Sequence, residues 1–349
     1  MKMKLLFTVI LAVSLMFIQG CGKKDEKQSS QPVVSSSDFA NLKSVDMSGK
    51  KVFLKYKFEK GEKLHYKLIA YTSSQQTIKT DTTAKSFGDQ TLTYFFDIEV
   101  LEIDSDNIAE LSVNVPQIKY EGQVNGQKML YDSKANISKE EKLKFLEFET
   151  VANTPFRVRI NSKGEIIEVT RIDKMIDKMI SMQPQAPKMT PEQKQELIKN
   201  IGEGEVKPRT QLLFRELTSN EVGKDSVWQK STPASLAVFK LENISSYNKV
   251  VDFVKVGEDN AVKLNALLDV KWSGDKKASE NGVDYLFDDP KVTGGGTILF
   301  NIDKGKVIRG ETNTTIELGV QIDAKSAANK KIRTIRKDIS TNKNVVELL

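Results

Sequence analysis

The sequence predicts a mainly β protein with a few inserted helices (α+β), in which long antiparallel strands form curved sheets. Beyond residue 50, apolar residues recur at every second position, whereas helical spacing is confined to a few short stretches. Two pairs of similar segments also follow one another in the same order. This order predicts two related halves that pack together as one half-barrel or sandwich body.

The strongest period-two runs lie in the first half of the chain, where one side of each run is apolar and the other polar. They are Val52 to Phe58, Leu64 to Ala70, Leu92 to Val100, and the pair Val113 and Val115. We expect half-buried antiparallel strands joined by hairpin turns. Long strands with one apolar face curl around a core or a cavity.

Helices are expected near residues 139–151, 171–182 and 191–202. Ser138 with Glu141, and Thr190 with Gln193, have the spacing of capping boxes, and Pro191 suits a first helical position. Gly202 or Gly204 should end the third helix, and residues 208–222 have room for one more short helix.

The helix near 171–182 is rich in methionine, with Met175, Met179 and Met182 close together. Methionine adapts to varied apolar partners, so this helix could serve as a lid over a lipid-sized cavity. The simpler interpretation, which we favour, is that Ile172 and its neighbours at helical spacing cover the core of a sheet.

The internal repeat rests on two comparisons. Residues 102–111 resemble 255–264, and residues 160–167 resemble 301–308. We expect four hairpins, with Asn107 and Asn260 in equivalent turns, and with Lys-Gly turns at 163–164 and 304–305. The alternative is chance, because Asp-Asn and Lys-Gly turns recur for backbone reasons.

The N-terminus has the pattern of an export signal. Lys2 and Lys4 precede an apolar stretch, Leu5 to Ile18, that is too short for a comfortable membrane span. The sequence Gly20-Cys21 then resembles the lipobox of bacterial lipoproteins, with Ile18 and Gln19 as mild departures. The resemblance implies that Cys21 carries a diacylglycerol thioether and becomes the new N-terminus. The alternative is an ordinary signal peptide with a chance cysteine.

These patterns divide the chain into a lipoprotein signal peptide (1–20), a flexible polar tether (21–45), a first β-rich half (46–205) and a second β-rich half (206–349). We expect a lipid-anchored protein of the bacterial cell envelope. Gly22 is not the Asp that resembles an inner-membrane retention signal, so the outer membrane is favoured, on its periplasmic side or at the cell surface. The charged run Lys23 to Glu26 resembles surface-export signals.

Few residues suggest chemistry. One Cys and one His exclude an intramolecular disulfide and His- or Cys-cluster metal sites. Asp104 to Asn107 lacks the later ligands of a calcium loop, Gly294 to Gly296 precedes an apolar β-run rather than a helix, and His65 has the pattern of a solvated strand residue. The acidic pair Asp288-Asp289 precedes Pro290 and indicates a turn. We therefore predict no enzyme, no catalytic or metal-binding residue and no cofactor. The only expected site residue is Cys21, as the lipidation site.

Several segments resemble a family of uncharacterised bacterial envelope lipoproteins: Leu54 to Glu62, Phe156 to Val158, and Gly294 to Ile298 leading into Asp303 to Gly305. The resemblance implies curved sheets with helical lids, as in carriers that cup an acyl chain. The expected function is non-catalytic binding of a hydrophobic molecule or an envelope protein partner. The alternative is a structural or surface-exposed lipoprotein without a small ligand. The membrane is a partner through the anchor, and the basic run Lys330 to Lys337 is expected to be a strand with a charged face, not a nucleic-acid arm. The oligomeric state stays open.

Overall fold

The computed structural model describes residues 42–47, 49–183, 189–325 and 331–349. Cys21 and the expected signal peptide lie outside the described residues. The described strands form one antiparallel sheet of fourteen strands. None of the helices in the described ranges is both long and apolar enough to cross a membrane.

The elements are short helices and long strands. The strands are β1 (Lys63–Lys79), β2 (Thr83–Ile103), β3 (Ala109–Val124), β4 (Gln127–Asp132), β5 (Phe156–Ile160), β6 (Ile166–Thr170), β7 (Val227–Leu236), β8 (Phe239–Val256), β9 (Asp259–Ser273), β10 (Lys277–Glu280), β11 (Val283–Phe287), β12 (Lys291–Asn301), β13 (Lys306–Lys325) and β14 (Lys331–Leu348). The helices are α2 (Lys139–Lys144), α3 (Leu146–Val151), α4 (Asp173–Met182), α5 (Pro191–Ile201), the π-helix η2 (Gly202–Val206) and α6 (Lys207–Gln211).

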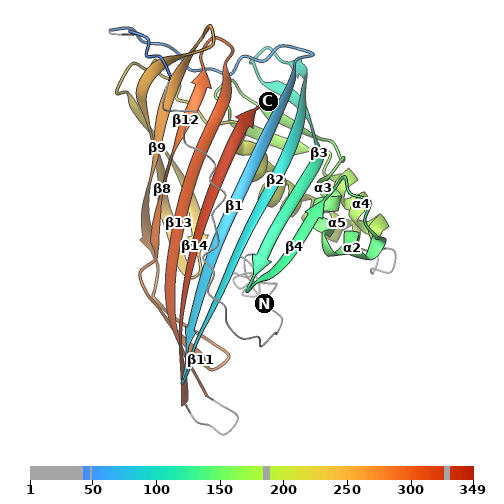
Figure 1. The fold of residues 1–349 in the computed structure, drawn as a ribbon, viewed down its shortest axis with the longest axis vertical. Helices are drawn as coiled ribbons and strands as arrows, with labels where there is room; N and C mark the ends of the chain where they lie inside the picture. The colour runs from blue at the N-terminus through green and yellow to red at the C-terminus, as the bar shows by residue number, and fades with distance from the viewer. Residues whose placement is uncertain (1–41, 48, 184–188, 326–330) are drawn as a thin grey trace.

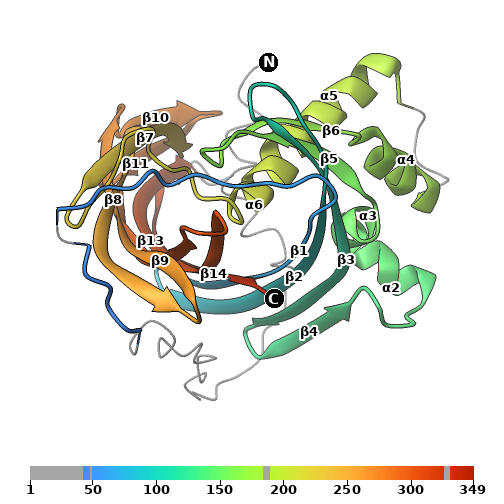
Figure 2. The ribbon, with the colours of Figure 1, turned by 90° about the horizontal axis from the view of Figure 1, so that it is seen from above.

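The main path of the sheet runs β6-β5-β3-β2-β1-β14-β13-β12-β9-β8-β7, with β4 added to β3 and the β10–β11 hairpin added to β13. The sheet curls around its long axis, and helices α2 to α5 gather beside β3 to β6 (Figures 1 and 2). The two end strands, β6 and β7, do not pair with each other in this order. The expected fold class is confirmed, and the body is a single curved sheet, so the half-barrel describes it better than the sandwich. We call its concave side the trough. The upper rim is the end where β1 begins and β14 ends.

The strand order repeats. The series β6-β5-β3-β2-β1 recurs as β13-β12-β9-β8-β7, with β14 inserted between the two series. Gly61 precedes β1 and Asp225 precedes β7, the strands with which each copy begins along the chain, and both residues have positive φ. Their N–H groups donate to the carbonyls of Val100 and Val250 at 2.7 and 3.0 Å. Val100 and Val250 also mark β-bulges at matching places in the β2–β3 and β8–β9 hairpins. These shared irregularities support the expected duplication.

The turns of the repeat match in part. Gly164 and Gly305, the glycines of the expected Lys-Gly turns, both adopt positive φ between paired strands. Asn107 also lies in a turn, at φ 59°. Asn260, however, does not, because it pairs with Lys255 inside the β8–β9 ladder. The shorter turn at residues 257–258 closes this hairpin earlier, so the expectation for Asn260 was wrong.

The chain crosses the upper rim twice, once before each copy of the repeat. Residues 52–58 are extended and bury Leu54 and Tyr56, but they do not form the expected strand. Their only ladder contact among the described residues is an antiparallel bridge in which Val52 and Val222 exchange N–H···O bonds of 3.0 and 2.9 Å. Val222 belongs to the equivalent segment before β7. An antiparallel bridge between equivalent segments is the arrangement that a two-fold axis produces.

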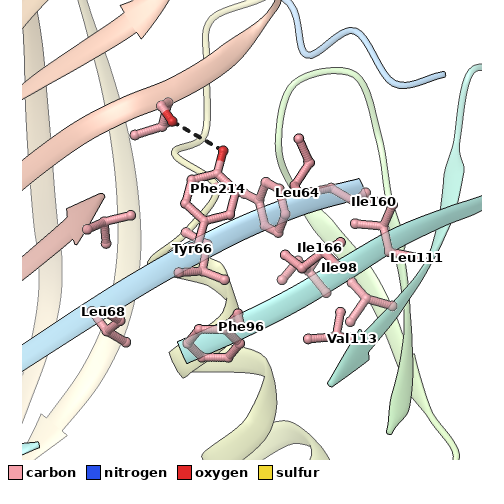
Figure 3. Packing of buried hydrophobic residues seen from close by; sticks show 14 of the residues in the cluster. Leu64, Tyr66, Leu68, Phe96, Ile98, Leu111, Val113, Ile160, Ile166 and Phe214 are labelled. Carbon is pink, nitrogen blue, oxygen red and sulfur yellow. Dashed lines mark hydrogen bonds between the residues drawn. The ribbon is translucent and has the colours of Figure 1, made fainter. Parts of the chain in front are cut away.

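Beneath these crossing segments, the upper part of the trough is filled by a continuous hydrophobic core (Figure 3). Tyr66 and Phe214 are fully buried with ring centroids 6.1 Å apart, and the Tyr66 hydroxyl donates to the carbonyl of Val307 at 3.2 Å. Tyr56 packs edge-on against Phe300 at 5.3 Å. Burying such side chains stabilises the fold by about 1.5–3 kcal/mol each.

The helices lie close to the expected ranges, but the one expected near 139–151 is interrupted at Phe145 into α2 and α3, and α4 begins at Asp173, two residues later than expected. Both capping boxes form, at Ser138 for α2 and at Thr190 for α5. The third helix, α5, ends at Ile201 with Gly202 as its C-cap, as expected, and the chain then continues without a break into the π-helix η2 and α6. In α4, Met175 is buried in the core, whereas Met179 is only half-buried. The methionine-rich helix therefore covers core, and its position gives the lid interpretation no support.

Candidate binding site on the concave face

Strand pairing aligns the concave side chains in rows across the sheet. The row through Leu68 is buried and belongs to the core; its members are Leu68, Val346, Gly310, Ile298, Leu264 and Val250. The next row away from the rim is half-buried and consists of small or polar residues: Ala70, Asn344, Thr312, Gly296, Ala266 and Asn248. The filled core ends between these two rows.

Beyond that second row, the trough has a polar side and an apolar side. The concave residues from Thr72 to Gln76 on β1 and from Asn342 to Asp338 on β14 are polar: Thr72 donates to Asn342 at 2.9 Å and Gln76 to Asp338 at 3.0 Å. On β9, β12 and β13 they are largely apolar and only half-buried, and comprise Leu268, Val270, Val292, Ile316 and Val320. Apolar side chains in this state still expose surface that a ligand could cover.

Arg215 enters the trough at the boundary between core and open part. Its segment follows α6, and its carbonyl accepts a hydrogen bond of 3.1 Å from the buried Tyr56 hydroxyl. The guanidinium points to the second row, where Nη2 lies 3.4 Å from the Thr312 hydroxyl oxygen. Burial lowers the pKa of Arg215 from its usual value, although a guanidinium stays charged at neutral pH.

No carboxylate pairs with Arg215 among the described residues. Glu216, the acidic residue next along the chain, forms an ion pair with Lys230 instead. The only hydrogen bond from the Arg215 side chain within the described ranges is the long one to Thr312. A guanidinium carries five N–H donors, so most of this donor capacity is unused by the protein.

A second charged cluster lies against the concave face of β2. Arg209 is 5.7 Å from the Tyr94 ring and forms an ion pair of 2.7 Å with Glu205, which η2 positions one helical turn earlier. Burial raises the pKa of Glu147 in α3, and Arg209 opposes that rise. The Tyr94 hydroxyl is buried and has no hydrogen-bond partner in the described part of the chain. Here, unlike at Arg215, the guanidinium is neutralised.

The acidic turn at Asp104 is explained by backbone hydrogen bonds. One carboxylate oxygen accepts from the N–H groups of Asp106 and Ile108, each at 2.9 Å, and the other pairs with Arg159 at 3.3 Å. These bonds, with that to Ile108 first, lower the pKa of Asp104. Across the described residues, no group of three or more His, Cys, Asp or Glu side chains is arranged to hold a metal ion.

The other residues that the sequence draws attention to have structural surroundings. Gly296 lies inside β12, where an added Cβ would come 2.2 Å from the carbonyl oxygen of Glu311, so close backbone packing requires glycine. His65 is exposed on β1, with Nδ1 2.7 Å from the carboxylate of Asp97. Asp288 follows β11 and donates its N–H to Gly319 at 2.9 Å.

The described chain enters the body at the upper rim. Residues 42–45, expected as the end of the tether, lie against β8: Lys255 donates to the carbonyl of Lys43 at 2.9 Å, and Val45 donates to Phe253 at 2.8 Å. A surface pocket of about 570 Å³ lies beside this segment. The carboxylate of Asp252 in this pocket already accepts a hydrogen bond from Ser44 at 2.5 Å. The pocket is therefore a weaker candidate for a charged ligand than the trough with its Arg215 guanidinium.

The comparisons with known proteins identify a family whose function is unknown. The model of a family of unknown function, DUF6263, matches residues 106–307, and the chain belongs to that family. No curated protein matches.

Two solved structures give weak likenesses. A structure described as "lipid-protein interactions in lipovitellin" is 10% identical, with a TM-score of 0.44; the match covers 84% of this chain but only 25% of that one. The outer membrane protein OpdK of Pseudomonas aeruginosa is 7% identical, with a TM-score of 0.15, over 80% of this chain and 98% of that one. Neither likeness carries a functional argument.

Proposed function

We propose that the protein is a lipid-anchored, non-catalytic lipoprotein of the bacterial cell envelope that holds a hydrophobic molecule in its trough. The observation that carries the binding function is the set of half-buried apolar side chains on β9, β12 and β13, which lie beside polar ones on the neighbouring strands β14 and β1. The anchor rests on Gly20-Cys21 at the end of the apolar N-terminal stretch. The outer membrane is the favoured location, because Gly22 replaces the retention signal.

The anchor is tested with Cys21→Ser. Lipoprotein processing attaches the lipid to this cysteine, which is the only one in the chain. We expect radiolabelled palmitate to enter the wild-type protein and not the variant, and the variant to leave the detergent-phase fraction. Label that persists in the variant would contradict the lipobox. An unrelated lipoprotein from the same cells provides the labelling control.

The ligand is tested by extracting the folded body. Residues 22–349 would be purified without detergent, extracted with organic solvent and examined by mass spectrometry. The test variant is Leu268→Asp, which places a charge on the apolar side of the trough. Its matched control is Leu267→Asp, which places the same charge on the convex side, where Leu267 is 63% exposed. We expect an extracted hydrophobic molecule from the wild type and from Leu267→Asp, and its loss from Leu268→Asp.

A structural lipoprotein without a small ligand is the second candidate. The filled core beneath the upper rim favours it, because that part of the trough leaves no room for a guest. Solvent extracts that contain no hydrophobic molecule above background would support this candidate over the first.

A further inference from the structure

We propose that Arg215 binds the anionic head of a single-chain amphiphile, with a carboxylate as the head group and the alkyl chain lying along the apolar side of the trough. This inference rests on the proposed binding function and deepens it by naming the class of ligand. It is carried by the position of one guanidinium where the core ends and the open trough begins.

The first step is charge. Within the described residues the Arg215 guanidinium has no carboxylate partner, and Glu216 is already paired with Lys230. A half-buried cation without a counter-ion is costly, because desolvation disfavours the charged form. An anionic ligand would supply the missing charge. One unpaired guanidinium balances one negative charge, so a carboxylate fits better than a phosphate dianion.

The second step is space. The row that Arg215 reaches consists of small or polar side chains, with Gly296 beside Thr312 and Ala266 beyond it. Large side chains at these positions would occupy the volume in front of the guanidinium. Asn344 pairs with Thr312 from the other neighbouring strand, so polar groups flank the same position.

The third step is direction. From this row, the concave residues of β9, β12 and β13 away from the rim include Leu268, Val270 and Ile316, all half-buried. A chain that starts at Arg215 and runs away from the rim therefore meets apolar side chains. Each methylene buried against them strengthens binding through the hydrophobic effect. Charge at one end and apolar surface below it together match an amphiphile.

The experiment compares palmitate, hexadecanol and hexadecyl phosphate, which share one alkyl chain, by equilibrium binding to residues 22–349. We expect palmitate to bind the wild type about tenfold or more tightly than hexadecanol, the size of effect for a hydrogen bond to a charged group. Arg215→Met should abolish this preference and leave hexadecanol binding unchanged. Arg159→Met removes a guanidinium that pairs with Asp104, and should keep the preference.

Arg215→Lys retains the charge but loses the planar fork, so an intermediate preference is expected; this variant decides the question if Arg215→Met does not fold in a thermal melt. Equal binding of palmitate and hexadecanol to the wild type would overturn the role of Arg215 and leave the proposed function intact. Tighter binding of hexadecyl phosphate would overturn the carboxylate assignment. Failure of all three ligands to bind would overturn this inference and count against a hydrophobic ligand as well.

Discussion

Single glycines connect the two halves at the upper rim. Gly305 turns at φ +64° directly beneath residues 55–57 of the first crossing segment, and Gly164 does so at φ +83° beneath the carbonyl of Arg215 in the second. Each half thus ends a hairpin against the segment that leads into the other half. In the same turn, the carbonyl of Lys163 accepts a hydrogen bond of 2.9 Å from the N–H of Leu217, which fixes the backbone next to Arg215.

Substitution of Gly305 should be much more damaging than substitution of Gly257. Both residues have positive φ, which costs an L-residue about 1–2 kcal/mol. A Cβ at Gly305 would also lie 2.5 Å from the backbone nitrogen of Lys57, whereas a Cβ at Gly257 meets nothing within 4 Å. We expect Gly257→Ala to lose about 1–2 kcal/mol and Gly305→Ala more than about 3 kcal/mol in urea unfolding. Equal losses would contradict the described contact.

Asp104 predicts a pH-dependent contribution to stability. Its pKa is lowered in the folded protein, so its stabilising effect is present above the unfolded pKa of about 3.9 and is lost as the pH falls through the folded value. Asp104→Ala should therefore have a lower Tm than the wild type at pH 7. The difference should shrink below about pH 4. Asp81, exposed in the turn between β1 and β2, serves as the control position for Asp→Ala.

At the scale of elements, the alternation of apolar and polar residues correctly predicted the strands that pack one face on the core. The runs at 64–70 and 92–100 became parts of β1 and β2, because Leu64, Tyr66 and Leu68 face the core that Figure 3 shows. The run at 52–58 alternates for the same reason, yet it crosses the rim and finds a ladder partner only at Val222. Alternation reports burial of one face and not the presence of a neighbouring strand.

The position of Arg215 could not have been predicted from the sequence. The residues around Arg215 show no regular spacing of apolar side chains, and its hydrogen-bond partner, Thr312, lies 97 residues further along the chain. Burial without a counter-ion depends on where every carboxylate falls in the fold, and local patterns carry no such information. The capping boxes at Ser138 and Thr190 were readable, because their hydrogen bonds join residues three apart.

The helix α4 offers a test of its role as a cover. Met175 is fully buried, and Met179, on the next turn, is half-buried. Met175→Ala should cost about 2–5 kcal/mol, as large-to-small core substitutions do, and Met179→Ala about 1 kcal/mol or less. Thermal melts of both variants distinguish these values. A larger loss at Met179 would place the packed side of α4 elsewhere.

At the scale of the whole molecule, the two copies of the repeat share one sheet and also contact each other across the upper rim. They meet through β14, between β1 and β13, and through the bridge of Val52 with Val222 at the upper rim. Equivalent strands run in the same direction in both copies, since every neighbouring pair is antiparallel and the two series begin six strands apart. The trough is therefore built by both halves, with one apolar side and one polar side.

A disulfide should lock the rim bridge. Val52 and Val222 form a hydrogen-bonded antiparallel pair, whose Cα separation of about 5.5 Å falls within the range for a disulfide. With Cys21→Ser, the chain carries no other cysteine. Val52→Cys with Val222→Cys should oxidise to one intramolecular species and gain about 2–4 kcal/mol. Phe53, which is 50% exposed and points elsewhere, gives the control pair Phe53→Cys with Val222→Cys, which should not cross-link.

The central place of β14 governs the order in which the molecule can assemble. Leu348 lies opposite Tyr66 in the ladder, so the strand made last joins the strand made first among those described. Contacts this distant in sequence form slowly, because a long loop must close before they contribute stability. Until β14 arrives, β1 and β13 present long unpaired edges, the kind that recruit other chains. A chain synthesised up to residue 325 should thus be prone to aggregate and dependent on a holding factor, and release of the final strand would act as the step that commits it to the native state.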